Sequence, residues 1–219
     1  MIVLRALSAL LSYPTAELGQ ALPEIADAVT SSPLIAPRER AGIVTLIDAL
    51  AGRDLMDAEQ RYVELFDRGR ATSLHLFEHL YGDSRERGDA MVELKRIYER
   101  AGFALTTNEL PDYLPVLLEY LSCRDVAEAR DMLSDCAHIL KRIAEALIAR
   151  DSLYAAVLQA LLVVAGEKPV DAASVPKTRQ QREDLDRDWI EEPAFAGVPL
   201  ASGAVVEPPG RDRNKATEG

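Results

Sequence analysis

The sequence predicts an all-α protein: a single-domain bundle of about nine helices over residues 1–165, followed by a mostly disordered C-terminal tail over residues 166–219. Apolar residues recur at intervals of three and four along most of the first 165 positions, which is the spacing of one face of an α-helix. The alternation typical of strands is nearly absent. Six of the twelve prolines lie in the tail, where large apolar residues become rare, and such a composition favours disorder.

Prolines, glycines and capping residues indicate where the first helices begin and end. Pro14 ends a helix over residues 3–11, because proline has no amide hydrogen to donate. Thr15 is expected to cap a second helix that runs to about residue 30 and is kinked or split at Pro23. A third apolar stripe over residues 43–50 ends at Gly52. A fourth helix then carries Tyr62, Leu65 and Phe66.

The same signals continue through the second half of the chain. Thr72 or Ser73 is expected to cap a helix over residues 74–80, and another helix carries a stripe over residues 91–101. A further helix begins near residue 112, residues 126–147 form one long helix, and residues 153–164 form a shorter one. In the tail only residues 181–190 show a helical pattern, with Leu185 and Trp189 four residues apart.

Charge and composition exclude several classes of partner. The chain has 36 acidic and 25 basic residues, a net charge of −11, whereas nucleic acids and anionic membranes reward clustered Lys and Arg. No apolar run approaches the about 20 residues that span a bilayer. Two cysteines are too few for a disulfide framework or a four-thiolate zinc site. We therefore expect a cytoplasmic protein that neither binds nucleic acid nor inserts into a membrane.

One short motif suggests catalysis. His75, Glu78 and His79 form the pattern H-x-x-E-H, and on a helix its two histidines would share one face and bind Zn²⁺ while the glutamate served as general base. A zinc metallopeptidase is thus the alternative hypothesis, although no third ligand is singled out. The favoured interpretation is that His75 faces solvent and His79 makes a structural hydrogen bond. Walker, dinucleotide-binding and G-x-S-x-G motifs are absent.

Residues 108–115 combine two prolines, two carboxylates and an aromatic residue at a helix start. Glu109 and Asp112 either cap this helix and complement its dipole, or form an acidic lip beside an apolar groove. Such a groove would suit a basic amphipathic helix. The residues alone favour the two interpretations equally.

Several runs of the chain resemble one family. Residues 62–74 (YVELFDRGRATSL), 76–79, 82–88 and 109–115 are similar to the NarJ-type nitrate reductase assembly chaperones, part of the wider all-α group of TorD and DmsD relatives. The resemblance covers about residues 1–165, with a weaker echo at residues 185–193. The wider group has an E-x-P-D-H signature, and this chain has Tyr113 in place of the histidine.

The resemblance implies a chaperone and no enzyme. Its client would be the apo catalytic α subunit of respiratory nitrate reductase, including an N-terminal segment that is a vestige of a twin-arginine leader. The chaperone would hold this subunit until bis-molybdopterin guanine dinucleotide is inserted, before docking to the membrane anchor. It would bind no cofactor stably itself, and proteins of molybdenum cofactor biosynthesis are candidate further partners.

The motif positions supply the expected client-binding site, and no catalytic or metal-binding residue is expected. Tyr62, Leu65 and Phe66 are expected to form the apolar floor of a groove. Glu109, Asp112 and Glu119 are expected to form its acidic rim. The remaining candidates, all within the motif runs, are Asp67, Arg70 and Tyr113.

Overall fold

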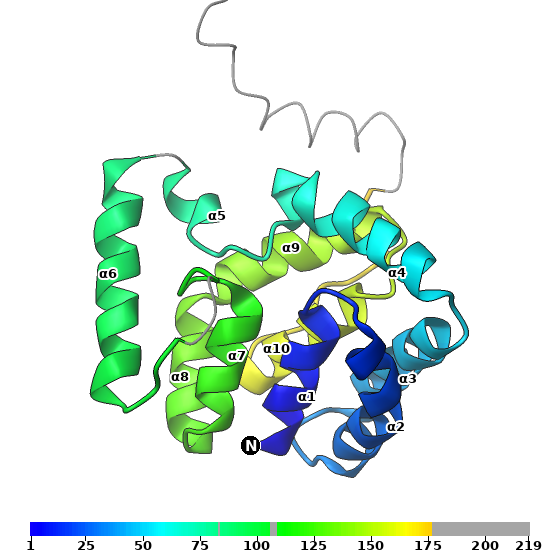
Figure 1. Ribbon diagram of the computed structural model, residues 1–219. Helices are drawn as coiled ribbons and strands as arrows, with labels where there is room; N and C mark the ends of the chain where they lie inside the picture. The colour runs from blue at the N-terminus through cyan, green and yellow to red at the C-terminus, as the bar shows by residue number, and fades with distance from the viewer. Residues whose placement is uncertain (83, 106–108, 177–219) are drawn as a thin grey trace, which may run out of the picture. The chain divides into compact units, whose positions relative to one another are not determined.

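The computed structural model describes residues 1–82, 84–105 and 109–176 (Figure 1). Over these ranges the chain forms ten α-helices, one π-helical turn and one 3-10 turn, and its only strand-like pairing is a single isolated β-bridge. The prediction of an all-α protein is thus confirmed. Residues 177–219 of the expected disordered tail, with its short helix carrying Leu185 and Trp189, fall outside the described residues, whereas residues 166–176 are described.

The first three helices begin and end where local sequence signals place them. Helix α1 spans Ile2–Leu11, α2 spans Ala16–Ser31 and α3 spans Pro37–Ala51. The Leu18 amide donates to the Thr15 hydroxyl oxygen, which satisfies one free donor at the start of α2. Pro23 lies inside α2 without dividing it, so the helix is not split there. Pro37 occupies the first turn of α3, where its missing amide hydrogen costs nothing.

The most apolar helix lies in the interior. Helix α10 (Ala155–Ala165) is apolar around most of its circumference, and it packs against α3, α8 and α9, as a helix without a polar face must. Gly42 permits a close approach of α3, because a Cβ atom at this position would lie 2.9 Å from the Cβ of Ala156. Helix α1 packs mainly against α7 (Leu114–Ser122).

The expected long helix over residues 126–147 is wrong, because the chain turns at Cys136. Helix α8 (Val126–Asp135) ends there, and α9 (Ala137–Ala149) begins on the next residue. The amides of Ile139 and Leu140 both donate to the Cys136 carbonyl and so open a new helix. Buried apolar residues continue at helical spacing on both sides of the turn, which is why periodicity did not reveal it.

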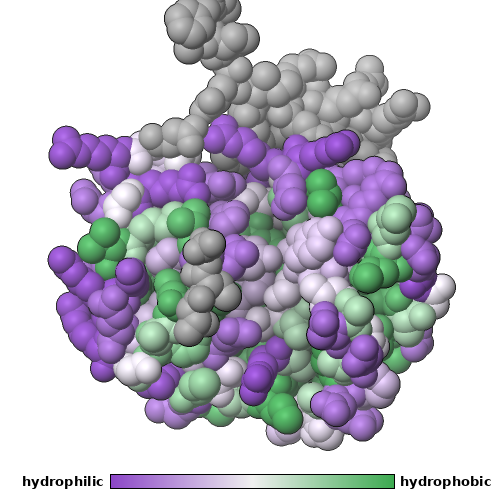
Figure 2. All heavy atoms as spheres, viewed as in Figure 1, coloured by the Kyte–Doolittle hydropathy of each residue, from purple (hydrophilic) through white to green (hydrophobic). Residues whose placement is uncertain are grey.

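The motif region is assembled from short elements. Helix α4 (Leu55–Tyr62) continues into the π-helical turn η1 (Val63–Asp67), which is followed by the 3-10 turn η2 (Arg70–Thr72) and by α5 (Glu78–Tyr81). Helix α6 (Arg85–Arg100) stands at the edge of the bundle in Figure 1, and Tyr98 is its only buried residue. Figure 2 shows hydrophilic atoms along the outer side of α6 and hydrophobic atoms next to them.

Packing continues beyond the last helix. The side-chain amide of Gln159 donates to the Val170 carbonyl and accepts from the Val170 amide, both at 2.8 Å. Val170 itself is buried. The domain boundary expected at residue 165 stays a prediction. In the described ranges, no helix is both long and apolar enough to cross a membrane.

Candidate functional site

The two motif-bearing segments, residues 62–82 and 109–115, meet in a short antiparallel contact. His75 and Tyr113 form the isolated β-bridge. In it, the Leu76 amide donates to the Asp112 carbonyl at 3.1 Å, and the first residue of α7 donates its amide to the Leu74 carbonyl at 2.8 Å. These two hydrogen bonds, which make up the β-bridge, hold together segments that lie more than 30 residues apart in the chain.

Tyr62 ties this contact to the first helix. Its hydroxyl donates to the Leu11 carbonyl at 2.7 Å and lies 2.8 Å from the Tyr113 hydroxyl. Since the single hydroxyl hydrogen of Tyr62 is used on Leu11, Tyr113 is the donor in the second bond. Burial raises the pKa of Tyr62 far above its usual value, and the neighbouring Tyr113 raises it further. Tyr62 therefore stays protonated and acts as a structural link.

Asp112 lies behind the contact and has no exposed surface. Its Oδ2 accepts from the Phe77 amide at 3.0 Å, and its Oδ1 lies 3.4 Å from Nδ1 of His75. This bond to Asp112 is the main reason why the pKa of His75 is raised, against the opposing effect of burial. A buried carboxylate needs such partners. Asp112 therefore presents no exposed charge, in contrast to the rim position expected for it.

The residues of the H-x-x-E-H pattern do not share a helical face. Residues 73–77 are not helical and α5 begins only at Glu78, so the expected helix over residues 74–80, capped by Thr72 or Ser73, is wrong. The reason is tertiary: the Leu76 amide pairs with Asp112 across the β-bridge, where a helix would pair it four residues back.

The side chains of the pattern are engaged in separate structural bonds. His79 donates through Nε2 to the Ser73 carbonyl at 2.9 Å, and burial lowers its pKa. Glu78 accepts from the Ser73 hydroxyl at 2.6 Å and pairs with Arg87 at 3.3 Å. Within the described ranges, no three His, Cys, Asp or Glu side chains are placed to hold a metal ion. The geometry gives no support to a zinc metallopeptidase.

The Asp67-Arg68-Gly69 turn is shaped by one wide helical turn and one glycine. The Arg68 amide donates to the Val63 carbonyl five residues back, the pattern of a π-helix. The Thr72 hydroxyl then bonds to the Leu65 carbonyl. A Cβ atom on Gly69 would lie 2.9 Å from this Thr72 hydroxyl oxygen, so only glycine fits without displacing the bond.

The nine residues expected to bind a client do not line one groove. Two are buried in an aromatic cluster with Tyr154, and a third is the buried Asp112. The others are half-buried or exposed, and Leu65 lines a cavity next to Tyr154. Besides Asp112, the buried residues are Tyr62 and Phe66. The half-buried ones are Leu65, Arg70 and Tyr113, and the exposed ones are Asp67, Glu109 and Glu119.

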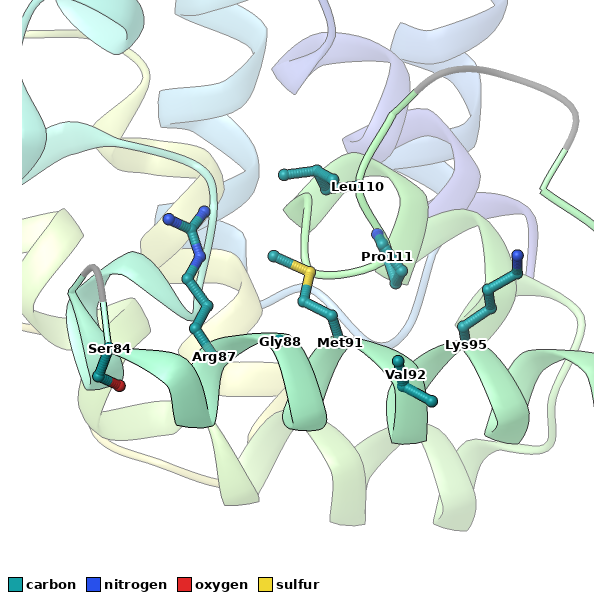
Figure 3. Close-up of a pocket in the computed structure, with 8 residues that line it drawn as sticks. All are labelled: Ser84, Arg87, Gly88, Met91, Val92, Lys95, Leu110 and Pro111. Carbon is teal, nitrogen blue, oxygen red and sulfur yellow. The ribbon is translucent and has the colours of Figure 1, made fainter.

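A groove does exist beside the second motif, between α6 and residues 110–111, and we call it the α6 groove. Its volume is about 490 Å³. Figure 3 shows Met91 projecting from α6 toward Leu110 and Pro111, with Arg87 and Lys95 on either side of it. Leu110 is 43% exposed and Val92 50%, which are large values for apolar side chains. The groove thus has an apolar floor between two cationic side chains.

Buried hydrogen bonds fix the position of Leu110 and Pro111, which form the wall of the α6 groove opposite α6. Tyr98, fully buried on α6, donates its hydroxyl to the Pro111 carbonyl at 2.9 Å. The next residue is Asp112, with its bonds to His75 and Phe77. The buried motif residues therefore position Leu110 and Pro111. Sequence reasoning missed Met91 and Val92 as groove residues, since only folding brings them to the second motif.

Fold and groove together define a class of protein: a domain that is all-helical over the described residues, with an apolar groove between α6 and the second motif. The family described as nitrate reductase delta subunit matches residues 15–160. The chain belongs to this family.

Three relatives agree with this assignment. The chain is 41% identical to the nitrate reductase molybdenum cofactor assembly chaperone NarJ of Escherichia coli (strain K12), over 88% of this chain and 84% of the relative. It is 41% identical to the probable assembly chaperone NarW of the same strain, over 65% and 64%. It is 33% identical to the probable assembly chaperone NarJ of Bacillus subtilis (strain 168), over 74% and 86%. All three are named as chaperones and none as an enzyme.

Proposed function

We propose that this chain is an assembly chaperone for nitrate reductase that assists insertion of the molybdenum cofactor and has no enzymatic activity of its own. The observation that carries the proposal is the 41% identity to a nitrate reductase molybdenum cofactor assembly chaperone over 88% of the chain. The client is the apo catalytic α subunit, bound in the cytoplasm before it docks to its membrane anchor.

The N-terminal segment of the α subunit docks in the α6 groove as an amphipathic helix. Helix-in-groove recognition uses apolar anchors at helical spacing on a preformed apolar floor, and exposed Leu110, Val92 and half-buried Met91 supply such a floor. Arg87 and Lys95 flank that floor, while exposed Glu109 adjoins Leu110. A basic client helix is therefore expected to turn its cations away from α6 and toward Glu109.

Binding of the segment keeps the α subunit open until bis-molybdopterin guanine dinucleotide is inserted. The chaperone binds the client, and the client, not the chaperone, binds the cofactor stably. Proteins of molybdenum cofactor biosynthesis are the proposed further partners. The groove supports a holding role, because an exposed apolar floor gains free energy by covering an apolar client surface. Release follows when the folded holo subunit withdraws that surface.

Co-purification tests both levels of the proposal. The tagged chain is isolated from cells that make cofactor-free nitrate reductase, with either the full α subunit or one lacking its N-terminal segment. We expect the full subunit to co-purify and the shortened one to be depleted. Leu110→Asp should reduce recovery, whereas Val126→Asp, at an equally exposed position (43%) on α8, should not. Failure to recover the full subunit would refute the chaperone role; equal recovery by both variants would refute only the groove.

A further inference from the structure

A second cavity lies away from the α6 groove and shares no residue with it. It has a volume of about 420 Å³ and is bounded by the C-terminal end of α3, by α4 with η1, and by the turn between α9 and α10. Its wall is divided between apolar side chains such as Leu46 and Leu65 and charged ones, chiefly Arg53, Arg61 and Arg150.

Two of these arginines have no partner within the described residues. The guanidinium groups of Arg53 and Arg61 make no hydrogen bond or ion pair there, although the chain carries a net charge of −11. Arg150 donates to the Ala146 carbonyl at 3.1 Å and adds a third cation to the wall. The carboxylates of Glu64 and Asp151 also line the cavity. Cations therefore exceed carboxylates by one.

The hydroxyl of Tyr154 lies on the same wall. Tyr154 is only 8% exposed, its ring packs edge-on against Phe66 at 5.1 Å, and its hydroxyl bonds to no described residue. Burial raises the pKa of Tyr154 to about 12, with the nearby charge of Arg53 acting in the opposite direction, so at neutral pH the hydroxyl is a donor. An anion between this hydroxyl and Arg53 would accept hydrogen bonds from both.

The turn beside Tyr154 has a conformation unusual for its residue. Asp151 has φ +51°, the only positive φ outside glycine in the described part of the chain. Hydrogen bonds from the Asp151 amide to Ile148 and from the Ser152 amide to Leu147 make this a helix end at which glycine is the usual residue. The aspartate at this position places a carboxylate on the cavity wall at a cost in backbone energy.

We propose that this cavity binds a small organic phosphate. The forked guanidinium groups of Arg53 and Arg61 suit a phosphate, which each can bind through two parallel hydrogen bonds, and the Tyr154 hydroxyl donates a further one. The volume exceeds that of a phosphate ion and lies in the range of small-ligand pockets. Leu46 and Leu65 cover the organic part, and the wall carboxylates accept its N–H or O–H groups.

Isothermal titration of the full chain with adenosine and guanosine monophosphates, the matching nucleosides and inorganic phosphate tests the proposal. We expect the nucleotides to bind, inorganic phosphate to bind more weakly and the nucleosides not to bind. Arg53→Gln or Arg61→Gln should weaken nucleotide binding about tenfold or more, as for the loss of a charged hydrogen bond. Tyr154→Phe should weaken it less. Arg38→Gln, at the other end of α3, is the matched control and should change nothing.

Melting curves accompany each variant, and Arg53→Lys, which keeps the charge but loses the fork, should bind with intermediate strength. Absence of nucleotide binding at millimolar concentration would overturn the proposal. So would unchanged binding by folded Arg53→Gln and Arg61→Gln, or equal binding of nucleosides. If inorganic phosphate bound as tightly as the nucleotides, the claim that the cavity also contacts the organic portion of the ligand would be overturned. No client is present in these titrations, so their outcome is independent of the chaperone role.

Discussion

Replacement of Asp112 tests whether a buried carboxylate organises the motif region. Asp112→Ala removes the acceptor for the Phe77 amide and the partner of His75. A hydrogen bond to a charged group contributes about 1.5–3 kcal/mol, and the Phe77 amide, left without an acceptor, adds the cost of its own desolvation. Breaking a buried pair by removal of one partner typically costs about 3–5 kcal/mol. We expect a loss in this range, a large part of the stability of a typical domain.

Asp112→Asn should be much milder, at about 1 kcal/mol. The amide keeps the shape of the side chain and retains an oxygen that can accept from Phe77. Asp89→Ala, at an exposed position on α6, is the control and should change stability by less than about 0.5 kcal/mol.

Urea unfolding followed by circular dichroism measures these differences. Titration of the folded variants with the N-terminal client segment then measures the consequence for the α6 groove, one wall of which Asp112 adjoins. We expect weaker binding by Asp112→Ala although the residue is buried. If the stability of Asp112→Ala lay within about 0.5 kcal/mol of the control, the carboxylate would not support the motif contact and the positioning argument would fail.

Three further predictions concern stability. The raised pKa of His75 in the folded state means that its stabilisation is full below the unfolded value of about 6.5 and is lost as pH rises through the folded value; His75→Gln should therefore lower the unfolding free energy more at pH 5.5 than at pH 8.5, and equal losses would contradict this. Gly19→Ala, with no atom near the new Cβ, should stabilise α2 by about 0.5–1 kcal/mol. Gly42→Ala should show no such gain, because its new Cβ would clash with the Cβ of Ala156. Thermal melts that rank the two variants in the opposite order would refute the close approach of α3 to Ala156. A chain ending at residue 176 should keep cooperative melting, whereas one ending at residue 166 loses Val170 and its two hydrogen bonds and should melt at a lower temperature; identical melting would show that this segment adds no stability.

Local signals in the sequence were sufficient for the fold class and for many helix boundaries. Thr15 caps α2, Gly52 ends α3 and Gly166, with φ +85°, ends α10, because each acts on backbone groups within a few residues of itself. Apolar periodicity identified the buried face of helices such as α1 for the same local reason, whereas of the stripe expected over residues 91–101 only Tyr98 is buried. The motif runs likewise indicated the family, because the identity and order of the residues in such a run belong to the sequence itself.

Only the tertiary structure decided how these elements meet. Periodicity shows which face of a helix is buried but not where the backbone turns, so the break at Cys136 was invisible. The β-bridge between His75 and Tyr113 overrode the local preference for a helix.

The character of each candidate site was also decided by tertiary packing. Asp112 became a buried support and not a rim charge because the Phe77 amide comes to it from 35 residues away. The meeting of α6 with Leu110, and of Arg53 and Arg61 with Tyr154, likewise joins residues distant in the chain. Exposure and partners of a polar side chain depend on such distant neighbours, and a pattern of residue types along one chain does not contain them.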